Sequence, residues 1–390
     1  MAACAGRLST VRLCPLHNLR GGRTRQTRNS CRGPDSLLSP SAVLIQEMGV
    51  PGRLPLLLVC TRAAVSAMVM AWPSLMLPGG AYMPQIGYGT WLSKPGEVYE
   101  GTKVALASGY RHVDEAWVYM NEEEVGKAIK EALADGTVKS REELFVTSKL
   151  WNNFHRPELV REGVEDSLKK LGLDYLDLYL IHFPVSFTPG TVEASSADET
   201  ETVPLKDTWL AMEKLVEEGL VRNIGVSNFE IAELKEIEAV NTKPIACNQF
   251  ETHPYYQRTE LVDYCNSAGI VVTAHSSMGG GANAMVSFHS SPPITEDATI
   301  AAIAQKHSTT PQAVLLAWGL QRPTAILPKS VTASRIKANL DDTLALKLDK
   351  EDISAIAKLD KPGLEGCYCH PKTPWLGRSE FTGSTKHYYG

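Results

Sequence analysis

The feature that most constrains this chain is an alternation of two hydrophobic periods, which begins near Pro73 and continues for most of its length. Segments 122–134, 158–171 and 261–268 repeat apolar residues every three or four positions, which is typical of helices that bury one face. Between such segments lie short β-branched runs that we expect to be strands: Gln85–Gly89, His112–Asp114, Phe145–Leu150, Leu176–His182, Arg222–Ser227, Ala246–Gln249, Val271–His275 and Ala325–Leu327. Alternating strands and helices predict a parallel sheet that is covered by helices.

Eight strand–helix units in roughly 300 residues, without a second break in composition, predict one closed α/β barrel of the (β/α)8 TIM type. A β-hairpin should precede it, because Leu75–Leu77 and Tyr82–Ile86 flank a Pro-Gly-Gly turn, and a long tail loop should follow it. A doubly wound sheet is the alternative. It is disfavoured because no glycine fingerprint follows the first strand, and Gly279–Gly281 follows the seventh strand without the required spacing.

Composition divides the chain into a leader, residues 1–72, and the barrel, residues 73–390. The leader holds nine Arg, no Lys and two acidic residues, whereas the whole chain has a net charge of −5. We expect the leader to be disordered, and two interpretations of it stay open. It is either an organellar transit segment or an upstream region ahead of a true start at Met68 or Met70.

Charge and cysteine usage narrow the classes of partner. A net charge of −5 gives no reason to expect nucleic acid or a membrane, and Arg62 interrupts the apolar stretch 54–72. The cysteines have no framework spacing, which favours a cytoplasmic location, with organellar import only if the leader is a transit segment. Cys367, Cys369 and His370 are too few for a four-ligand zinc site, so we expect no metal. We expect a monomer or a weak dimer.

Four chemically active side chains follow successive predicted strands. Asp114 ends the second strand, and Tyr119 lies five residues beyond it. Lys149 lies near the end of the third strand, and His182 ends the fourth. In a closed barrel the C-terminal strand ends meet at one rim, where catalytic residues are found. An Asp and a Lys inside apolar strands are costly unless they pair, which predicts a buried Asp114–Lys149 pair.

This pair suggests how Tyr119 could act as an acid. The pKa of a free tyrosine is about 10, too high for efficient proton transfer at neutral pH. We expect the Lys149 ammonium to stabilise tyrosinate and lower the pKa of Tyr119, while Asp114 fixes the position of Lys149. Neutral His182 is expected to donate a hydrogen bond to a substrate carbonyl and orient it.

The motifs around these residues resemble those of the aldo-keto reductase superfamily. The match runs from about Met76 to beyond Leu359 and consists of GYRHVDEAWVYMNEEEVGKAI (109–129), SKLW (148–151), LDYLDLYLIHFP (173–184), IGVSNF (224–229), CNQFETHPYY (247–256) and LPKSVTASRIKAN (327–339). The resemblance implies a catalytic tetrad, formed by Asp114, Tyr119, Lys149 and His182. A His at the fourth place implies carbonyl reduction, since relatives that reduce steroid double bonds carry Glu there.

The resemblance also implies NADPH/NADP+ as the cofactor. Its nicotinamide carboxamide would meet Ser227, Asn228 and Gln249, whose side chains offer the donors and acceptors that an amide needs. At the adenosine end, Lys329 and Arg335 would clamp a 2′-phosphate near a helix N-terminus, which favours NADPH over NADH. The other implied cofactor contacts are Thr90, His275, Ser276, Met278, Ser330, Val331, Thr332 and Asn339.

The sequence departs from the family pattern at some of these places. His275 stands where a Tyr usually stacks on the nicotinamide, and Gly279–Gly281 replace a belt loop with clamping side chains, which predicts looser cofactor retention. Ala338 replaces an acidic adenine contact. Glu115 stands beside Asp114 where a small residue is usual. If it were buried it would raise the cost of ionising Asp114, but we expect its carboxylate to point outward or to meet a cation.

The implied substrate walls are aromatic and predict a largely apolar cleft. They are formed by Trp91, Trp117, Trp151, His182 and Phe183. The leading hypothesis is NADPH-dependent reduction of aldehydes, with aldoses and small ketones as further substrates. The alternatives are a sugar-alcohol or glycerol dehydrogenase that works in the oxidative direction, a non-catalytic regulatory barrel that binds NADPH, and a crystallin-like structural protein.

Overall fold

The structure is a computed structural model that describes residues 73–279, 293–361 and 363–369. Three segments on which expectations were placed lie outside these residues: the leader 1–72, the belt residues 280–282 and the tail beyond Cys369.

Eight parallel strands form the barrel, and each one pairs with the next along the chain. They are β3 (Tyr88–Gly89), β4 (His112–Asp114), β5 (Phe145–Leu150), β6 (Leu178–Ile181), β9 (Ile224–Ser227), β10 (Cys247–Glu251), β11 (Val271–His275) and β12 (Thr324–Ile326). The sheet closes on itself beside β3, where Ile86 pairs in parallel with Ile326 and the Gly87 amide donates to the Ile326 carbonyl at 2.9 Å. The predicted closed (β/α)8 barrel is therefore confirmed.

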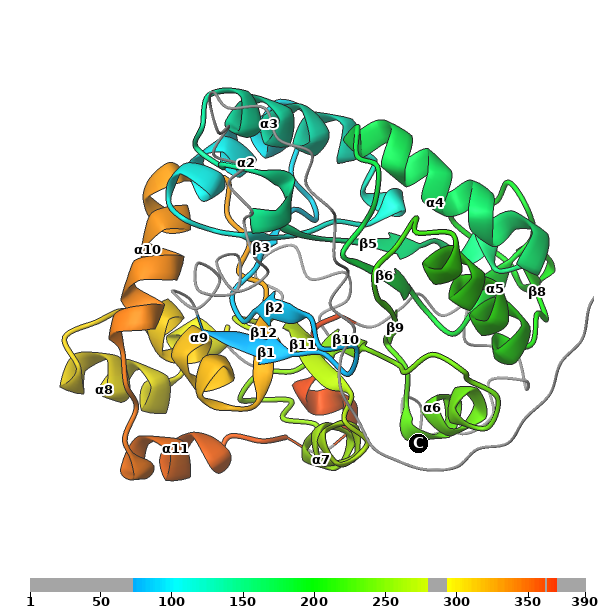
Figure 1. Ribbon diagram of the computed structural model, residues 1–390. Helices are drawn as coiled ribbons and strands as arrows, with labels where there is room; N and C mark the ends of the chain where they lie inside the picture. The colour runs from blue at the N-terminus through cyan, green and yellow to red at the C-terminus, as the bar shows by residue number, and fades with distance from the viewer. Residues whose placement is uncertain (1–72, 280–292, 362, 370–390) are drawn as a thin grey trace, which may run out of the picture. The chain divides into compact units, whose positions relative to one another are not determined.

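Helices surround the strands, as Figure 1 shows. They are α2 (Glu97–Ala107), α3 (Glu122–Ala134), α4 (Pro157–Leu171), α5 (Leu205–Glu217), α6 (Ile231–Glu238), α7 (Thr259–Ser267), α8 (Ala298–Lys306), α9 (Pro311–Gln321), α10 (Ala333–Ala345) and α11 (Lys350–Ala357). Helix α3 has the predicted bounds. It packs closely on α4, since a Cβ added at Gly126 would lie 2.3 Å from the carbonyl oxygen of Leu171.

Several strands are shorter than the sequence predicts. The expected strand Leu176–His182 is regular only over Leu178–Ile181, and Leu176 keeps an isolated bridge to Val221. The β-branched and apolar pattern continues past the ladder because these residues stay buried in the loops that enter and leave the barrel.

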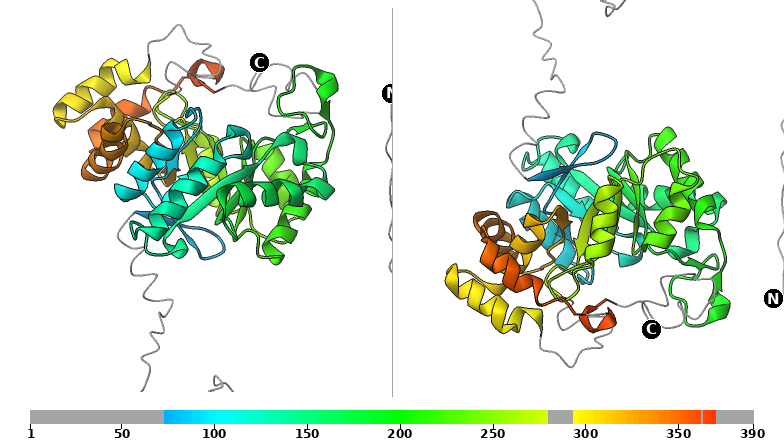
Figure 2. Two further views of the ribbon diagram at one scale, coloured as in Figure 1. Left: turned by 90° about the horizontal axis from the view of Figure 1, so that it is seen from above. Right: turned by 90° about the horizontal axis from the view of Figure 1, so that it is seen from below.

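The hairpin β1 (Ser74–Met76) and β2 (Tyr82–Pro84) is antiparallel, as predicted. Leu77 and Met83 are buried in a cluster that includes Leu178, so the hairpin packs onto one end of the barrel interior. Figure 2 shows the hairpin and the short helix η7 (Gly363–Gly366) at opposite ends of the barrel. The end with η7 is where the strands finish and where the candidate site lies.

A small antiparallel pair, β7 (Ser186–Phe187) and β8 (Thr200–Glu201), lies in the loop after β6. Arg156 holds it through Glu201: Nε donates to Oε1 at 2.9 Å and to Oε2 at 3.1 Å, and Nη2 donates to Oε2 at 2.5 Å. The Trp151 indole donates to the Val192 carbonyl of the same loop at 2.7 Å. These contacts fix the loop beside the strand ends.

Candidate active site

A buried ion pair lies at the C-terminal ends of β4 and β5. Lys149 Nζ donates to Asp114 Oδ1 at 2.6 Å, and both side chains are almost completely buried. The ammonium also donates to the carbonyl oxygen of Glu115 at 2.8 Å. Burial opposes the charge on Lys149, but Asp114 and Tyr119 outweigh it, so the pKa of Lys149 is raised and its charge is kept. The predicted Asp114–Lys149 pair is present.

Tyr119 meets this pair from the short helix η1 (Trp117–Tyr119), which ends at Met120 in the left-handed conformation. Lys149 Nζ lies 3.3 Å from the Tyr119 hydroxyl. The predicted fall in pKa is wrong: burial raises the pKa of Tyr119 to about 12, and Lys149 offsets only part of that rise. The Asp114 carboxylate, which lies closer to the ammonium than the phenol does, opposes the effect of Lys149 and adds to the rise.

His182 follows β6 and faces Tyr119, with ring centroids 5.9 Å apart. Phe183 stacks on its ring at 5.0 Å and Trp151 meets it edge-on at 5.1 Å. Burial lowers the pKa of His182 well below its usual value, so the ring is neutral. Its Nδ1 has no hydrogen-bond partner among the described residues. A neutral imidazole in this place has hydrogen-bonding capacity left for a ligand.

Glu115 does not behave as the sequence suggests. Its side chain is completely buried, and neither carboxyl oxygen has a hydrogen-bond partner of good geometry in the described part of the chain. Burial raises the pKa of Glu115 well above its usual value. The Thr90 hydroxyl is nearby but donates to the Asp114 carbonyl at 2.9 Å, so it can only accept from Glu115. Both observations indicate a protonated carboxyl, and the expected outward or cation-paired carboxylate is wrong.

The side chains assigned to the nicotinamide end come together beside the ion pair. Gln249 Nε2 donates to Asp114 Oδ2 at 2.7 Å, and the Ser227 hydroxyl donates to the Gln249 carbonyl at 2.8 Å. Asn228 is in the left-handed conformation, and its Oδ1 lies 3.1 Å from His275 Nε2. These residues surround the rim on three neighbouring strands, β9, β10 and β11.

His275 is partly buried, and its Nδ1 lies 3.1 Å from the Ser276 hydroxyl. Burial lowers the pKa of His275 to about 4, so the ring is neutral at physiological pH. Met278 packs against two of the apolar clusters behind this segment.

The residues assigned to the phosphate end lie where β12 leads into α10. Helix α10 begins without a side-chain cap, since Thr332 makes no capping bond and its own amide donates to the Ser330 hydroxyl at 3.1 Å. Neither Lys329 nor exposed Arg335 has an ion-pair partner among the described residues. Two cations at an uncapped helix N-terminus suit a phosphate. Of the other residues assigned here, Val331 is exposed and Asn339 is buried.

The aromatic walls divide into two groups. Trp151 and Phe183 lie beside His182, and Trp91 is partly exposed in the turn after β3. Trp117, in contrast, packs edge-on against Phe154 at 5.1 Å and donates from its indole to Asp166 of α4 at 2.6 Å. Its indole is held against the helical layer, so the expectation that Trp117 is a wall of the cleft is corrected.

Sequence reasoning missed Glu251, the last residue of β10. Its carboxylate is buried and accepts hydrogen bonds from Tyr368 and Cys369 in the tail. The sequence did hold a signal, because residues two apart on a strand share a face and Gln249 was already assigned to the rim.

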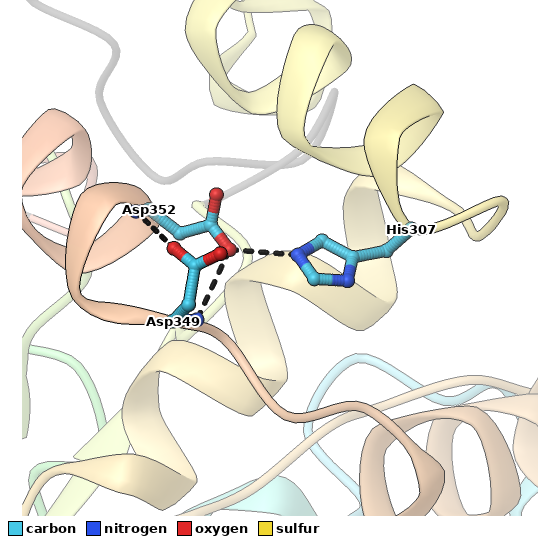
Figure 3. Close-up of side chains that lie close together, drawn as sticks. All are labelled: His307, Asp349 and Asp352. Atoms are coloured by element: carbon cyan, nitrogen blue, oxygen red, sulfur yellow. Dashed lines mark hydrogen bonds and ion pairs between the residues drawn. The ribbon is translucent and has the colours of Figure 1, made fainter.

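One cluster of metal-ligand types occurs among the described residues, away from the barrel rim (Figure 3). Asp349 and Asp352 form the capping box of α11, and His307 Nε2 lies 2.7 Å from Asp352 Oδ2. Lys306 Nζ already pairs with both carboxylates. The cluster is thus accounted for by helix capping and ion pairing.

Comparisons with known proteins agree with this geometry. Residues 85–361 match the model of the aldo/keto reductase family. The chain is 45% identical over 298 residues to aldo-keto reductase family 1 member C3 of Homo sapiens, which covers 73% of this chain and 90% of that protein. It is 44% identical over 296 residues to prostaglandin-E(2) 9-reductase of Oryctolagus cuniculus, with the same shares covered. Within the described residues, no helix has the length and apolar character needed to cross a bilayer.

A solved structure is also similar to this one. The aldose reductase from Schistosoma japonicum aligns with a TM-score of 0.69 and 38% sequence identity, over 77% of this chain and 99% of that chain.

Proposed function

The chain belongs to the aldo/keto reductase family and is an NADP-dependent oxidoreductase that acts on carbonyl or hydroxyl groups, and we propose that it works as an NADPH-dependent reductase of aldehydes, with aldoses and small ketones as further substrates. The observation that carries this proposal is the buried contact of Tyr119 with the Lys149–Asp114 pair beside neutral His182. A protonated phenol and a neutral imidazole are two groups that can donate hydrogen bonds to one carbonyl oxygen.

In the proposed reaction, bound NADPH supplies the hydride that reaches the carbonyl carbon. The Tyr119 hydroxyl gives its proton to the carbonyl oxygen, which becomes the alcohol. Lys149 keeps its charge and stabilises the phenolate that remains, and Asp114 holds Lys149 in place. The His182 ring orients the carbonyl oxygen toward the phenol. Water then returns a proton to Tyr119.

The raised pKa of Tyr119 keeps the phenol protonated before turnover, although it also makes the phenol a weaker acid. Reduction needs a protonated phenol before each turnover, and a pKa of about 12 keeps Tyr119 protonated at every physiological pH. Oxidation would need tyrosinate as a base, which this buried site disfavours. The dehydrogenase stays the alternative, because one site catalyses both directions and the ratio of NADPH to NADP+ decides between them.

Three further features support the cofactor, the substrate class and the cell compartment. The uncapped start of α10 with Lys329 and Arg335 suits the 2′-phosphate of NADPH. The rings of Trp151 and Phe183 lie together beside His182 and would give a substrate an aromatic wall, which suits apolar carbonyl compounds. Cys247 and Cys265 are buried thiols within the barrel, which supports a cytoplasmic location.

The test is the variant Tyr119→Phe, assayed by NADPH consumption with a panel of aldehydes, aldoses and ketones. We expect turnover to fall by roughly three orders of magnitude or more, since a general acid and its hydrogen bond are lost together. NADPH binding should be unchanged. Tyr99→Phe is the matched control, because within the described residues the Tyr99 hydroxyl bonds to Glu131 and Lys103, two surface side chains on α3 and α2. Retained turnover in Tyr119→Phe would refute the assignment of the proton donor.

A further inference from the structure

The carboxylate of Glu251 gathers several donors at the rim of the barrel. It accepts from the backbone amides of Tyr368 at 2.7 Å and Cys369 at 2.9 Å, and from the Cys367 thiol at 3.0 Å. The ring nitrogen Nε2 of His253 lies 2.8 Å away. Three of these four partners belong to the tail, more than one hundred residues later in the chain.

This carboxylate is a fixed anion. Burial acts to raise the pKa of Glu251, but the hydrogen bond and charge of His253 and the amide of Tyr368 prevail and lower it to about 2. A buried carboxylate that accepts backbone amides binds them more tightly than a neutral acceptor would. The tail is therefore held by charge-assisted hydrogen bonds at any physiological pH.

The tail is also seated closely on the loop that follows β10. A Cβ added at Gly366 would lie 2.0 Å from the carbonyl oxygen of Tyr255, so only a glycine lets the two backbones approach. The Tyr368 ring packs 5.1 Å from the ring of His253. Shape and charge together fix segment 363–369 at this place.

A line of polar contacts joins the tail to the nicotinamide end of the site. The Cys369 thiol lies 3.0 Å from the Ser276 hydroxyl, which lies 3.1 Å from Nδ1 of His275. On the other side of that ring, Nε2 lies 3.1 Å from Oδ1 of Asn228. The tail thus crosses the ends of β10 and β11, and Cys369 is connected to Asn228 through Ser276 and His275.

We propose that Glu251 is a positioning residue, which clamps the tail segment 363–369 across the rim and, through Ser276 and His275, holds Asn228 ready for the carboxamide of the cofactor. The effect on cofactor binding rests on the proposed function, whereas the clamp itself does not. Release of the clamp should expose the tail thiols and weaken NADPH binding without removing any group that takes part in proton transfer.

The first measurement is the rate at which Cys367 reacts with a maleimide, located by peptide mass spectrometry. Cys367 is 2% exposed, so it reacts only when the tail opens. In Glu251→Gln we expect labelling on the order of tenfold faster, because an amide nitrogen would face a backbone donor in place of an anion. Cys247 and Cys265, both buried in the barrel, should stay protected and report that the fold is intact.

The second measurement is the dissociation constant of NADPH, followed by quenching of tryptophan fluorescence. We expect a rise of severalfold in Glu251→Gln and a rise in the KM for NADPH, with kcat changed by less than about twofold. Glu213→Gln is the matched control. Glu213 is another buried glutamate that accepts backbone amides, from Thr242 at 2.6 Å and Lys243 at 2.8 Å, but it lies on α5 away from the tail.

Gly366→Ala releases the tail while leaving Glu251 intact, and it replaces Glu251→Gln if that variant exposes the barrel cysteines. The clamp would be overturned if Cys367 were labelled at the wild-type rate in whichever of the two variants keeps the barrel cysteines protected. Faster labelling with an unchanged NADPH dissociation constant would overturn the link to Asn228. Failure of the Tyr119 assignment would leave the labelling result untouched, so the two proposals fail separately.

Discussion

Replacing Glu115 by Gln should stabilise the protein increasingly as the pH rises. Glu115 is 0% exposed, and no cation of the described residues lies within hydrogen-bond reach of its carboxyl, so ionising it would leave a charge there without solvent or partner. Burial raises the pKa of its carboxyl well above the usual value. Gln has nearly the same shape as the protonated acid and cannot ionise, so it isolates this one effect.

The sign and size follow from linkage. An acid with a raised pKa in the folded state binds its proton more tightly there than in the unfolded chain, where the carboxyl titrates near 4.3. The stability that the protonated carboxyl contributes is fully present below the pKa of the unfolded chain. It is lost as the pH rises toward the pKa that the carboxyl has in the folded state. The loss is at most about 1.4 kcal/mol per pH unit, or about 2.7 kcal/mol between pH 5 and pH 7 if the carboxyl stays protonated throughout.

The assay is thermal unfolding of the wild type and Glu115→Gln at several pH values from 5 to 9. We expect the gap between their melting temperatures to widen from pH 5 to pH 7, by roughly 4–5 °C at the upper limit of the free-energy change. Glu236→Gln, at an exposed position on α6, is the control and should track the wild type. Parallel curves for Glu115→Gln and the wild type would refute the reasoning, since they would mean that Glu115 is ionised and paired.

Two further predictions concern charges at the rim. Lys149→Met leaves Asp114 buried without its cation, so we expect about 3–5 kcal/mol of destabilisation and loss of NADPH-dependent turnover; an unchanged melting temperature would contradict the buried pair. Arg335→Ala should reduce the preference for NADPH over NADH, measured as a ratio of kcat/KM values, by about tenfold or more. An equal loss with both cofactors would show that Arg335 does not contact the 2′-phosphate.

The barrel and its central pair follow from residue pattern alone. Strand and helix periods alternate eight times, which predicts a closed (β/α)8 barrel. An Asp and a Lys in apolar strands are costly to bury unless they pair with each other. Asp114 and Lys149 meet for that reason. The bounds of α3 were also predictable, because acidic residues fill its first turn and its apolar face is regular.

The electrostatic balance of the site was less predictable, because it depends on distances that a sequence does not contain. Lys149 was expected to lower the pKa of Tyr119, but its charge is closer to Asp114 than to the phenol, and burial prevails. Trp117 was assigned to the cleft from its place in a motif. In the structure its indole donates to Asp166 of α4, which holds the ring in the helical layer. A motif fixes the backbone position of a side chain and leaves its rotamer to the neighbours.

Asp114 joins the two halves of the site, and this explains why both halves depend on one buried charge. One of its oxygens accepts from Lys149 at 2.6 Å, and the other accepts from Gln249 at 2.7 Å. The first bond belongs to the proton donor and the second to the residues assigned to the carboxamide. A carboxylate with both oxygens engaged cannot shift toward one partner without weakening the other. Substitution of Asp114 should therefore disturb proton transfer and cofactor placement together, which the separate variants of Tyr119 and Glu251 do not.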